Sequence, residues 1–224
     1  MIPDKKAAKI TGILFLAATA FYMLGNSLIE SIVNDPDYLH MVYLHKNQVI
    51  LGMLLELLNS AAIVGIAIVL FPILKKHNET IALGYVAFRI MEAIILIVGA
   101  ISPLLLILLS KEYIEAGSPE ASYFQTIGKL AIEWKDLAFQ LAMIVLGLYS
   151  LLVCYLLFQS RIIPRSLSVL GFIGYASLLI NALLWIFGYR SGMILFLPGA
   201  LFEIILPIWL IVKGFNTFAN ADRR

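Results

Sequence analysis

Residues 81–109 read IALGYVAFRIMEAIILIVGAISPLLLILL, an apolar segment that is interrupted by only two charged residues. A hydrocarbon core about 30 Å thick needs roughly 20 helical residues to cross it, so this segment is long enough to span a membrane. Arg89 and Glu92 lie in its middle, and their i,i+3 spacing places them on one face of a helix. The segment therefore predicts a transmembrane helix that carries a charged pair inside the bilayer.

The composition of the whole chain is that of a membrane protein. Of its 224 residues, 62% are hydrophobic and 13% are charged, and the mean hydropathy is +0.96. Soluble domains are about half apolar and a quarter charged. The net charge is only +2 and the Lys and Arg residues do not cluster with aromatic residues, so no nucleic-acid partner is indicated. The single cysteine, Cys154, excludes an intrachain disulfide and a cysteine-based zinc site.

Six apolar segments predict an all-α fold, a polytopic membrane bundle of six transmembrane helices that forms one domain over residues 1–224. The segments are residues 10–33, 47–74, 80–109, 137–158, 166–187 and 193–213. Small residues at positions 18–20 in the first segment also fit a signal-peptide cleavage site. We expect a spanning helix instead, because the apolar segment continues well past this site.

The distribution of Lys and Arg predicts that both termini are cytoplasmic. Six crossings place the two termini on the same side of the membrane. That side holds Lys5, Lys6, Lys9, Lys75, Lys76, Arg161, Arg165, Lys213, Arg223 and Arg224. The other side holds Lys46, Lys111, Lys129, Lys135 and Arg190. Cytoplasmic loops are enriched in Lys and Arg, so the side with more of them is expected to face the cytoplasm.

The longest segment on the other side, residues 110–136, contains YFQTIGKLAIEWKD at 123–136. This pattern predicts a short amphipathic helix on the membrane surface, anchored by Trp134. Asp136 is expected to begin the next spanning helix, where a carboxylate is favourable against the helix dipole. A capping role for Asp136 is favoured over a role in a site. Gln140, one turn further on, suits an interhelical hydrogen bond or a polar track that extends inward.

Four charged residues lie in the interior of the predicted spans, away from the span ends: Glu56, Arg89, Glu92 and Glu203. At about 1.5 Å of rise per residue they converge on the middle third of the bilayer, with Asn59 one turn from Glu56. Each would cost at least about 2.5 to 3.5 kcal/mol if it faced lipid, so all four are expected to face the bundle interior. Three carboxylates would then share a single guanidinium. Neutrality requires that a proton or a cation supplies the missing positive charge.

Two interpretations of this cluster remain open. In the first, the charges form a structural network that fixes helix register. In the second, they line a polar pocket that binds a ligand or relays protons. The second interpretation predicts a ligand-binding site made of Glu56, Asn59, Arg89, Glu92, Asp136, Gln140 and Glu203.

No other motif points to chemistry. The chain contains no HExxH, GxSxG, P-loop or paired-glycine nucleotide motif, so no catalytic group and no cofactor are indicated. His40 and His45 suggest an alternative metal site at the surface, but their i,i+5 spacing places them on different helical faces, which favours a solvated loop. Pro103, Pro198 and Pro207 are candidates for kinks that free carbonyl groups.

Several segments resemble a bacterial membrane protein family, domain of unknown function 4386. They are LGYVAFRIMEAIIL at 83–96, SRIIPRSLSVLG at 160–171 and FEIILPIWLIVKGF at 202–215. The likeness covers nearly the whole chain except the two larger outer loops. It implies a six-helix prokaryotic membrane protein with no assigned activity. It also implies that Arg89, Glu92, Asp136 and Glu203 are matched motif positions.

The leading functional hypothesis is a protein of the bacterial inner membrane that binds or permeates a small cationic or amphiphilic molecule. Glu56, Glu92 and Glu203 would supply the counter-charges, and Arg89 would set their protonation. A second hypothesis is an interaction or regulatory subunit whose charges are structural. A third is an intramembrane enzyme acting on lipid, for which no nucleophile or metal site is evident. The expected partners are the lipid bilayer and a small-molecule or lipid ligand.

Overall fold

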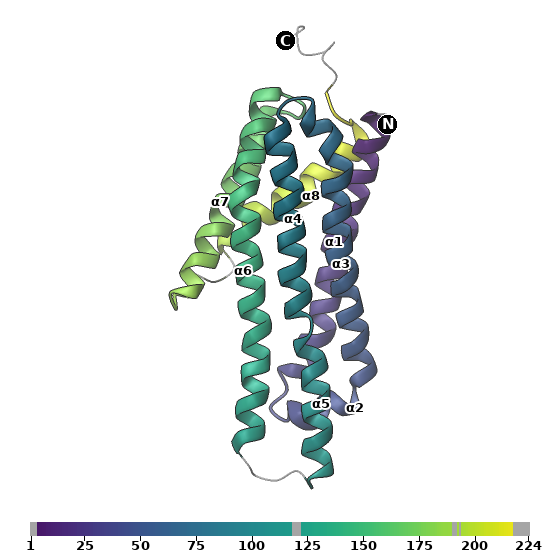
Figure 1. The fold of residues 1–224 in the computed structure, drawn as a ribbon, viewed down its shortest axis with the longest axis vertical. Helices are drawn as coiled ribbons and strands as arrows, with labels where there is room; N and C mark the ends of the chain where they lie inside the picture. The colour runs from purple at the N-terminus through teal and green to yellow at the C-terminus, as the bar shows by residue number, and fades with distance from the viewer. Residues whose placement is uncertain (1–3, 118–121, 190–191, 193, 217–224) are drawn as a thin grey trace.

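Within the part of the chain that the structure describes, all regular secondary structure is helical. The computed structural model describes residues 4–117, 122–189, 192 and 194–216. The helices are α1 (Asp4–Val33), α2 (Tyr38–Leu44), α3 (Lys46–Lys75), α4 (Glu79–Gly99), α5 (Ser102–Glu115), α6 (Ser122–Ser160), α7 (Arg165–Ile186), the 3₁₀ helix η1 (Ile194–Phe196) and α8 (Leu197–Val212) (Figure 1). Six helical segments among them are long and apolar enough to cross a membrane, with α4 and α5 counted together. The predicted all-α bundle of six spans is confirmed.

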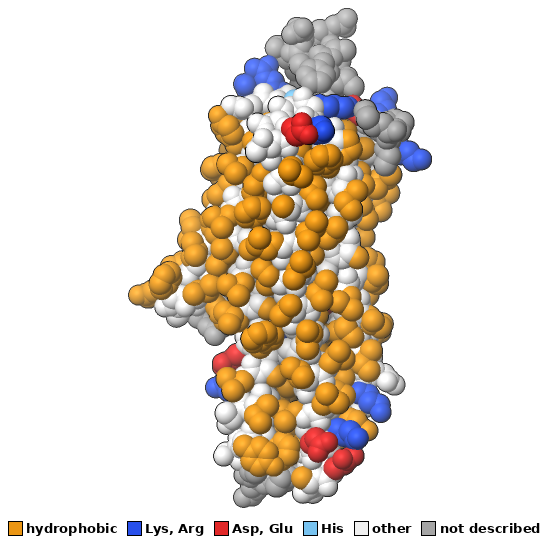
Figure 2. Space-filling model, in the orientation of Figure 1, with side chains coloured by type: hydrophobic (Ala, Val, Ile, Leu, Met, Phe, Trp, Pro, Cys, Tyr) orange, Lys and Arg blue, Asp and Glu red, His pale blue; other side chains and the backbone are white. Residues whose placement is uncertain are grey.

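The surface of the bundle is apolar along most of its length. Figure 2 shows apolar side chains over the shaft, with the charged side chains gathered towards its two ends. Leu54, Ile94 and Leu148 are examples of apolar side chains about half exposed on α3, α4 and α6. A continuous apolar surface of this extent suits contact with lipid and not with water. The chain is therefore a multi-pass membrane protein.

Both ends of the described chain lie at one end of the bundle, which we call the terminal end (Figure 1). The Nζ of Lys76, just after α3, is 2.8 Å from a carboxylate oxygen of Asp4 at the start of α1. The backbone N–H of Asn216, after α8, donates to the carbonyl of Ile162 at 2.8 Å. These contacts agree with an even number of crossings. Arg190, Arg223 and Arg224, which entered the orientation prediction, lie outside the described residues.

The predicted span 80–109 is broken into two helices. α4 ends at Gly99 and α5 begins at Ser102, with Pro103 in the first turn of α5. Proline has no backbone N–H to continue the hydrogen bonds of the preceding helix, but it is well tolerated in a first turn. The kink predicted at Pro103 is therefore present as a break, and α5 extends the span to Glu115.

The predicted boundary near residue 137 is wrong. α6 is one continuous helix over Ser122–Ser160, with no separate surface helix at 123–136. No proline interrupts this stretch, and buried residues continue into its first half at Phe124 and Gly128. At about 1.5 Å per residue α6 is about 58 Å long, almost twice the thickness of a hydrocarbon core. Asp136 therefore lies in the helix interior, so its predicted capping role is also wrong.

The part of α6 before residue 137 packs with α2 and α5 at the end of the bundle opposite the termini, and we call these three elements the headpiece (Figure 1). The loop predicted around His40 and His45 is instead the helix α2, held to α5 by Ser110. The Ser110 hydroxyl donates to the Leu39 carbonyl and accepts the Tyr43 backbone N–H at 3.0 Å. Burial of these polar groups against each other makes the headpiece an ordered part of the fold.

Small residues allow the spanning helices to approach closely. A Cβ atom added to Gly52 of α3 would lie 2.7 Å from Ile29 Cγ1 and 2.8 Å from the carbonyl oxygen of Gly25, both on α1. A Cβ on Gly174 of α7 would lie 2.8 Å from the Cα of Gly199 on α8. Contacts of this kind between small residues are a general means of packing helices in membranes.

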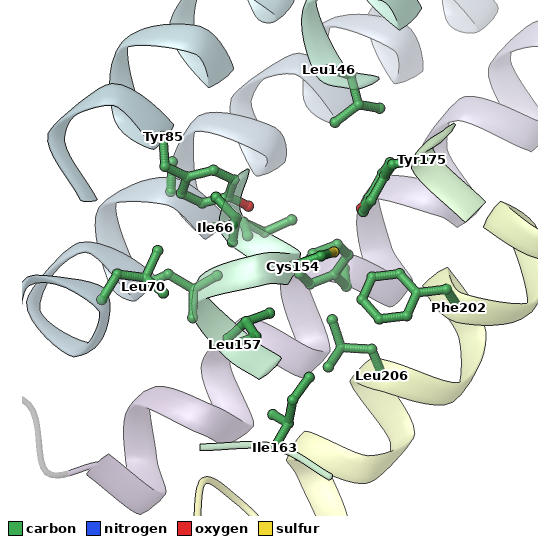
Figure 3. Close-up of a cluster of buried hydrophobic side chains, with 14 of the residues drawn as sticks. Ile66, Leu70, Tyr85, Leu146, Cys154, Leu157, Ile163, Tyr175, Phe202 and Leu206 are labelled. Atoms are coloured by element: carbon green, nitrogen blue, oxygen red, sulfur yellow. The ribbon is translucent and has the colours of Figure 1, made fainter. Parts of the chain in front are cut away.

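The interior of the terminal end is filled by apolar side chains. Tyr85 of α4, Cys154 of α6, Tyr175 of α7 and Phe202 of α8 gather there with aliphatic neighbours (Figure 3). The rings of Tyr175 and Phe202 meet edge to face, with centroids 5.6 Å apart. This cluster, which we call the apolar base, lies between the terminal end of the bundle and its polar interior.

Candidate functional site

A cavity of about 200 Å³, which we call the inner cavity, lies inside the bundle and is lined by residues of α1, α3, α4, α6, α7, η1 and α8. Its polar side chains include Asn59, Arg89, Glu92 and Glu203. Most of the remaining wall is apolar, with aromatic rings from Phe15, Tyr22, Phe139 and Phe196. The structure thus brings four of the seven predicted site residues to one cavity.

Arg89 and Glu92 form a buried ion pair on the wall of this cavity, as their spacing predicts. The Nη1 of Arg89 lies 2.8 Å from Glu92 Oε2 and 3.1 Å from Oε1. The Arg89 Nε donates to the Tyr85 hydroxyl at 3.2 Å. The relative exposure of the two side chains is only 5% and 2%. Each charge is therefore neutralised by the other within one helix.

Glu203 lines the same cavity from α8 but has no cationic partner of its own. No Lys or Arg nitrogen of the described residues lies within 4.0 Å of its carboxylate. The buried Tyr175 of α7 lies close to it. Pro207, four residues further along α8, cannot donate to the Glu203 carbonyl, so this backbone oxygen is also released from the helix. Glu203 is therefore the carboxyl group of the inner cavity that forms no ion pair within the described residues.

A second and larger cavity of about 660 Å³ lies next to the inner cavity on the headpiece side, and we call it the outer cavity. It is lined by the other three predicted site residues, Glu56, Asp136 and Gln140, and also by Asn59. Gln140 is 7% exposed, and its Oε1 is buried without a hydrogen-bond partner in the described part of the chain. Asp136 is an exposed residue that also lines two smaller cavities of the headpiece.

Glu56 pairs with Lys135 and not with Arg89. The Lys135 Nζ lies 2.7 Å from Glu56 Oε1 and 2.9 Å from the Oδ1 of Asn26 on α1. The expectation that three carboxylates share one guanidinium is therefore wrong, because Lys135 is a second interior cation.

The depth assigned to Glu56 explains this error. Measured along the helices from the terminal end, Glu56 is about 28 Å away, whereas Arg89 and Glu203 are about 15 Å and 14 Å away. The sequence predicts Glu56 at about 13 Å from the other end of its span, but that end lies in the headpiece, where the helices have unequal lengths. Glu56 consequently belongs to the outer cavity.

Lys135, Asn26 and Tyr22 are site residues that the sequence reading missed. Lys135 falls in the surface helix predicted at 123–136, and its neighbours offer one signal for the site. Continuing the helical period of 137–158 backwards places Lys135 and Asp136 about one turn before Phe139 and Gln140. No local pattern distinguishes Asn26 or Tyr22 from ordinary residues of an apolar helix.

The two cavities share the side chains of Tyr22, Asn59, Leu96, Phe139 and Phe196. Tyr22 of α1 and Phe139 of α6 stack, with ring centroids 5.4 Å apart and planes inclined by 13°. The stacked rings of Tyr22 and Phe139 and the amide of Asn59 therefore lie at the boundary between the inner cavity and the more polar outer cavity. On its other side the inner cavity meets the apolar base of the terminal end, since Ile66 and Leu146 belong to both.

The lining of the two cavities is acidic. Five carboxylates, from Glu30, Glu56, Glu92, Asp136 and Glu203, face two cationic groups, from Arg89 and Lys135. Within the described residues no group of three His, Cys, Asp or Glu side chains is placed to hold a metal ion. A cavity lining in which carboxyl groups outnumber cationic groups, with amide oxygens and aromatic rings, is suited to an organic cation.

Comparison with known proteins adds a family match. A family model described as Domain of unknown function (DUF4386) matches residues 10–214, a range that contains every residue of both cavities. No curated protein and no solved structure matches the chain.

Proposed function

The chain belongs to the DUF4386 family, because the family model covers residues 10–214 of 224, and from this premise we propose that it binds a small organic ammonium ion in its inner cavity. The carboxylate of Glu203, for which the described residues offer no cation, is the observation that carries the proposal. Arg89 and Glu92 cancel each other, so the inner cavity accepts a single positive charge. Its apolar and aromatic walls suit a ligand with a hydrocarbon or aromatic substituent.

The ligand would reach this site from the headpiece side. The outer cavity adjoins the inner one and opens among acidic residues, whereas the apolar base lies on the terminal side. Following the positive-inside rule, we place the terminal end in the cytoplasm and the headpiece outside the inner membrane of a bacterium. A binding protein or a carrier that loads from outside agrees with this geometry. Accessibility of single cysteines introduced in α2 and next to Lys76 to a membrane-impermeant thiol reagent on intact cells tests the orientation.

The test of binding uses benzylammonium with benzyl alcohol as a neutral molecule of the same shape. Purified protein in detergent should gain thermal stability with benzylammonium and should gain little with benzyl alcohol. A ligand at 100 times its Kd stabilises a protein by about 2.7 kcal/mol, which corresponds to a Tm increase of about 5 °C or more for a chain of this size. Glu203→Gln keeps the shape of the side chain and removes its charge.

We expect Glu203→Gln to weaken benzylammonium binding by at least about 30-fold, because loss of a desolvated charge partner costs about 2 kcal/mol or more. Glu79→Gln is the matched control, since Glu79 lies at the exposed start of α4 and pairs with Lys75 at 2.8 Å. The proposal is contradicted if both variants bind benzylammonium as the unaltered protein does, or if benzyl alcohol stabilises the protein equally well.

A structural charge network, as in an interaction or regulatory subunit, is the second candidate function. It is favoured by the two internal ion pairs, Arg89 with Glu92 and Lys135 with Glu56, which satisfy four of the charged residues without any ligand. It does not account for Glu203. Purification of the protein with one stoichiometric partner, together with the absence of a benzylammonium effect, would favour this alternative.

A further inference from the structure

The ammonium group of Lys135 occupies a site formed by oxygen atoms of other helices. From α6, Lys135 donates a hydrogen bond to Asn26 Oδ1 on α1 at 2.9 Å and forms an ion pair with Glu56 Oε1 on α3 at 2.7 Å. The Lys135 side chain is only 18% exposed. α1 and α3 thus form a binding site for a primary ammonium group, and the Lys135 side chain of α6 occupies it.

The outer cavity has space and polar groups beyond those that the Lys135 ammonium group contacts. Its volume is about 660 Å³, and the carboxylates of Glu30 and Asp136 also line it. The Oε1 of Gln140, a side chain that is more than nine-tenths buried, has no hydrogen-bond donor in the described part of the chain. A buried carbonyl oxygen without a donor is unfavourable, so a molecule with N–H groups would be stabilised here.

We propose that the outer cavity is a second binding site, selective for small cations that carry N–H donors, and that Lys135 is a tethered competitor for it. An arriving ammonium ion takes the oxygen atoms of Asn26 and Glu56 while the flexible Lys135 side chain moves into the rest of the cavity. A primary ammonium has three N–H donors, as Lys135 itself has, whereas a quaternary ammonium has none. This proposal extends the proposed function, because a cation that travels to the inner cavity passes this site first.

Chemical rescue tests the site without reference to the inner cavity. Lys135→Ala removes the tethered ammonium, leaves Glu56 without its cation, and opens space for propylammonium. We expect a lowered Tm that rises with propylammonium in a saturable manner and recovers most of the loss. Tetramethylammonium at equal concentration should recover little, because it lacks N–H donors.

Two further variants serve as controls for the rescue. Lys129→Ala removes an exposed lysine of the same helix and should show no specific response to propylammonium. In Lys135→Ala/Glu56→Gln the carboxylate is neutral, so the rescue should disappear. The proposal is overturned if propylammonium raises the Tm of Lys135→Ala no more than that of Lys129→Ala, or if the double variant is rescued as well.

If Lys135→Ala does not fold, the proposal can be tested on the unaltered protein. Acetylation of individual lysines, followed by mass spectrometry, should be slow at Lys135 relative to Lys129. Guanidinium ions at low millimolar concentration carry N–H donors and are not acetylated, so they should accelerate acetylation at Lys135 alone by severalfold. Unchanged reactivity of Lys135 with guanidinium would overturn the proposal.

The rescue and the benzylammonium test can fail separately. If Glu203→Gln has no effect but propylammonium rescues Lys135→Ala, the inner site is refuted and the outer site remains. If benzylammonium binding depends on Glu203 but no rescue occurs, the outer site is refuted.

Discussion

Removal of the Arg89 charge should lower the stability of this protein more than almost any other single substitution in the bundle. Arg89→Met keeps an unbranched side chain of similar length but leaves Glu92 without its partner. Arg89 and Glu92 are 5% and 2% exposed, and their closest nitrogen and oxygen atoms are 2.8 Å apart. Glu203 faces the same cavity, so two uncompensated carboxylates would then share it.

The magnitude follows from the burial of the pair. Loss of one partner from a buried ion pair costs about 3–5 kcal/mol, because the remaining charge stays desolvated. For a chain of 150–250 residues each kcal/mol corresponds to about 2–4 °C, so the Tm should fall by roughly 6–20 °C. The double variant Arg89→Met/Glu92→Met removes both charges, and its Tm should lie much closer to that of the unaltered protein.

Thermal unfolding in detergent, followed by circular dichroism, compares the Tm of the unaltered protein, Arg89→Met and the double variant under one condition. Lys111→Met is the matched control, because Lys111 and Glu115 form an exposed pair at 3.5 Å. Pairs of that kind contribute about 0–1 kcal/mol, so this variant should be nearly unchanged. The reasoning is refuted if Arg89→Met behaves like Lys111→Met, or if the double variant loses as much stability as Arg89→Met alone.

Three other outcomes are expected. Gly52→Ala should destabilise the protein by about 1–3 kcal/mol, because its Cβ would lie 2.7 Å from Ile29 Cγ1, and an unchanged Tm would contradict this close packing. Ser110→Ala should cost about 1–3 kcal/mol and speed hydrogen exchange in α2, because the Tyr43 N–H loses its acceptor; equal exchange rates would count against it. Partial burial and the neighbouring Lys76 lower the pKa of His77 from its ordinary 6.5. The folded state therefore favours neutral His77. The stability that this contributes is complete above pH 6.5 and is lost as the pH falls through the lower pKa of the folded state. His77→Gln should flatten that part of the Tm profile, and an unaltered profile would exclude the effect.

The errors in the sequence reading share one cause. The extension of the third span to Glu115 and the unbroken course of α6 are both matters of where a helix ends, and apolar composition marks only the portion that suits the hydrocarbon core. α6 continues beyond that portion because its first half packs in the headpiece. Lys135 was misplaced for the same reason, and with it the charge balance of the site.

The sequence by itself determined the class of protein, its six spans and the pairing of Arg89 with Glu92. Apolar length reports on the membrane directly, and an i,i+3 contact within one helix is fixed by the helix geometry alone. Only the tertiary structure decided that Glu56 pairs with Lys135, that Tyr175 meets Glu203, and that these groups divide between two cavities. Such contacts depend on the rotation of each helix about its axis and on its shift along that axis. Those two quantities are set by the packing of side chains between helices, which no local pattern in the chain encodes.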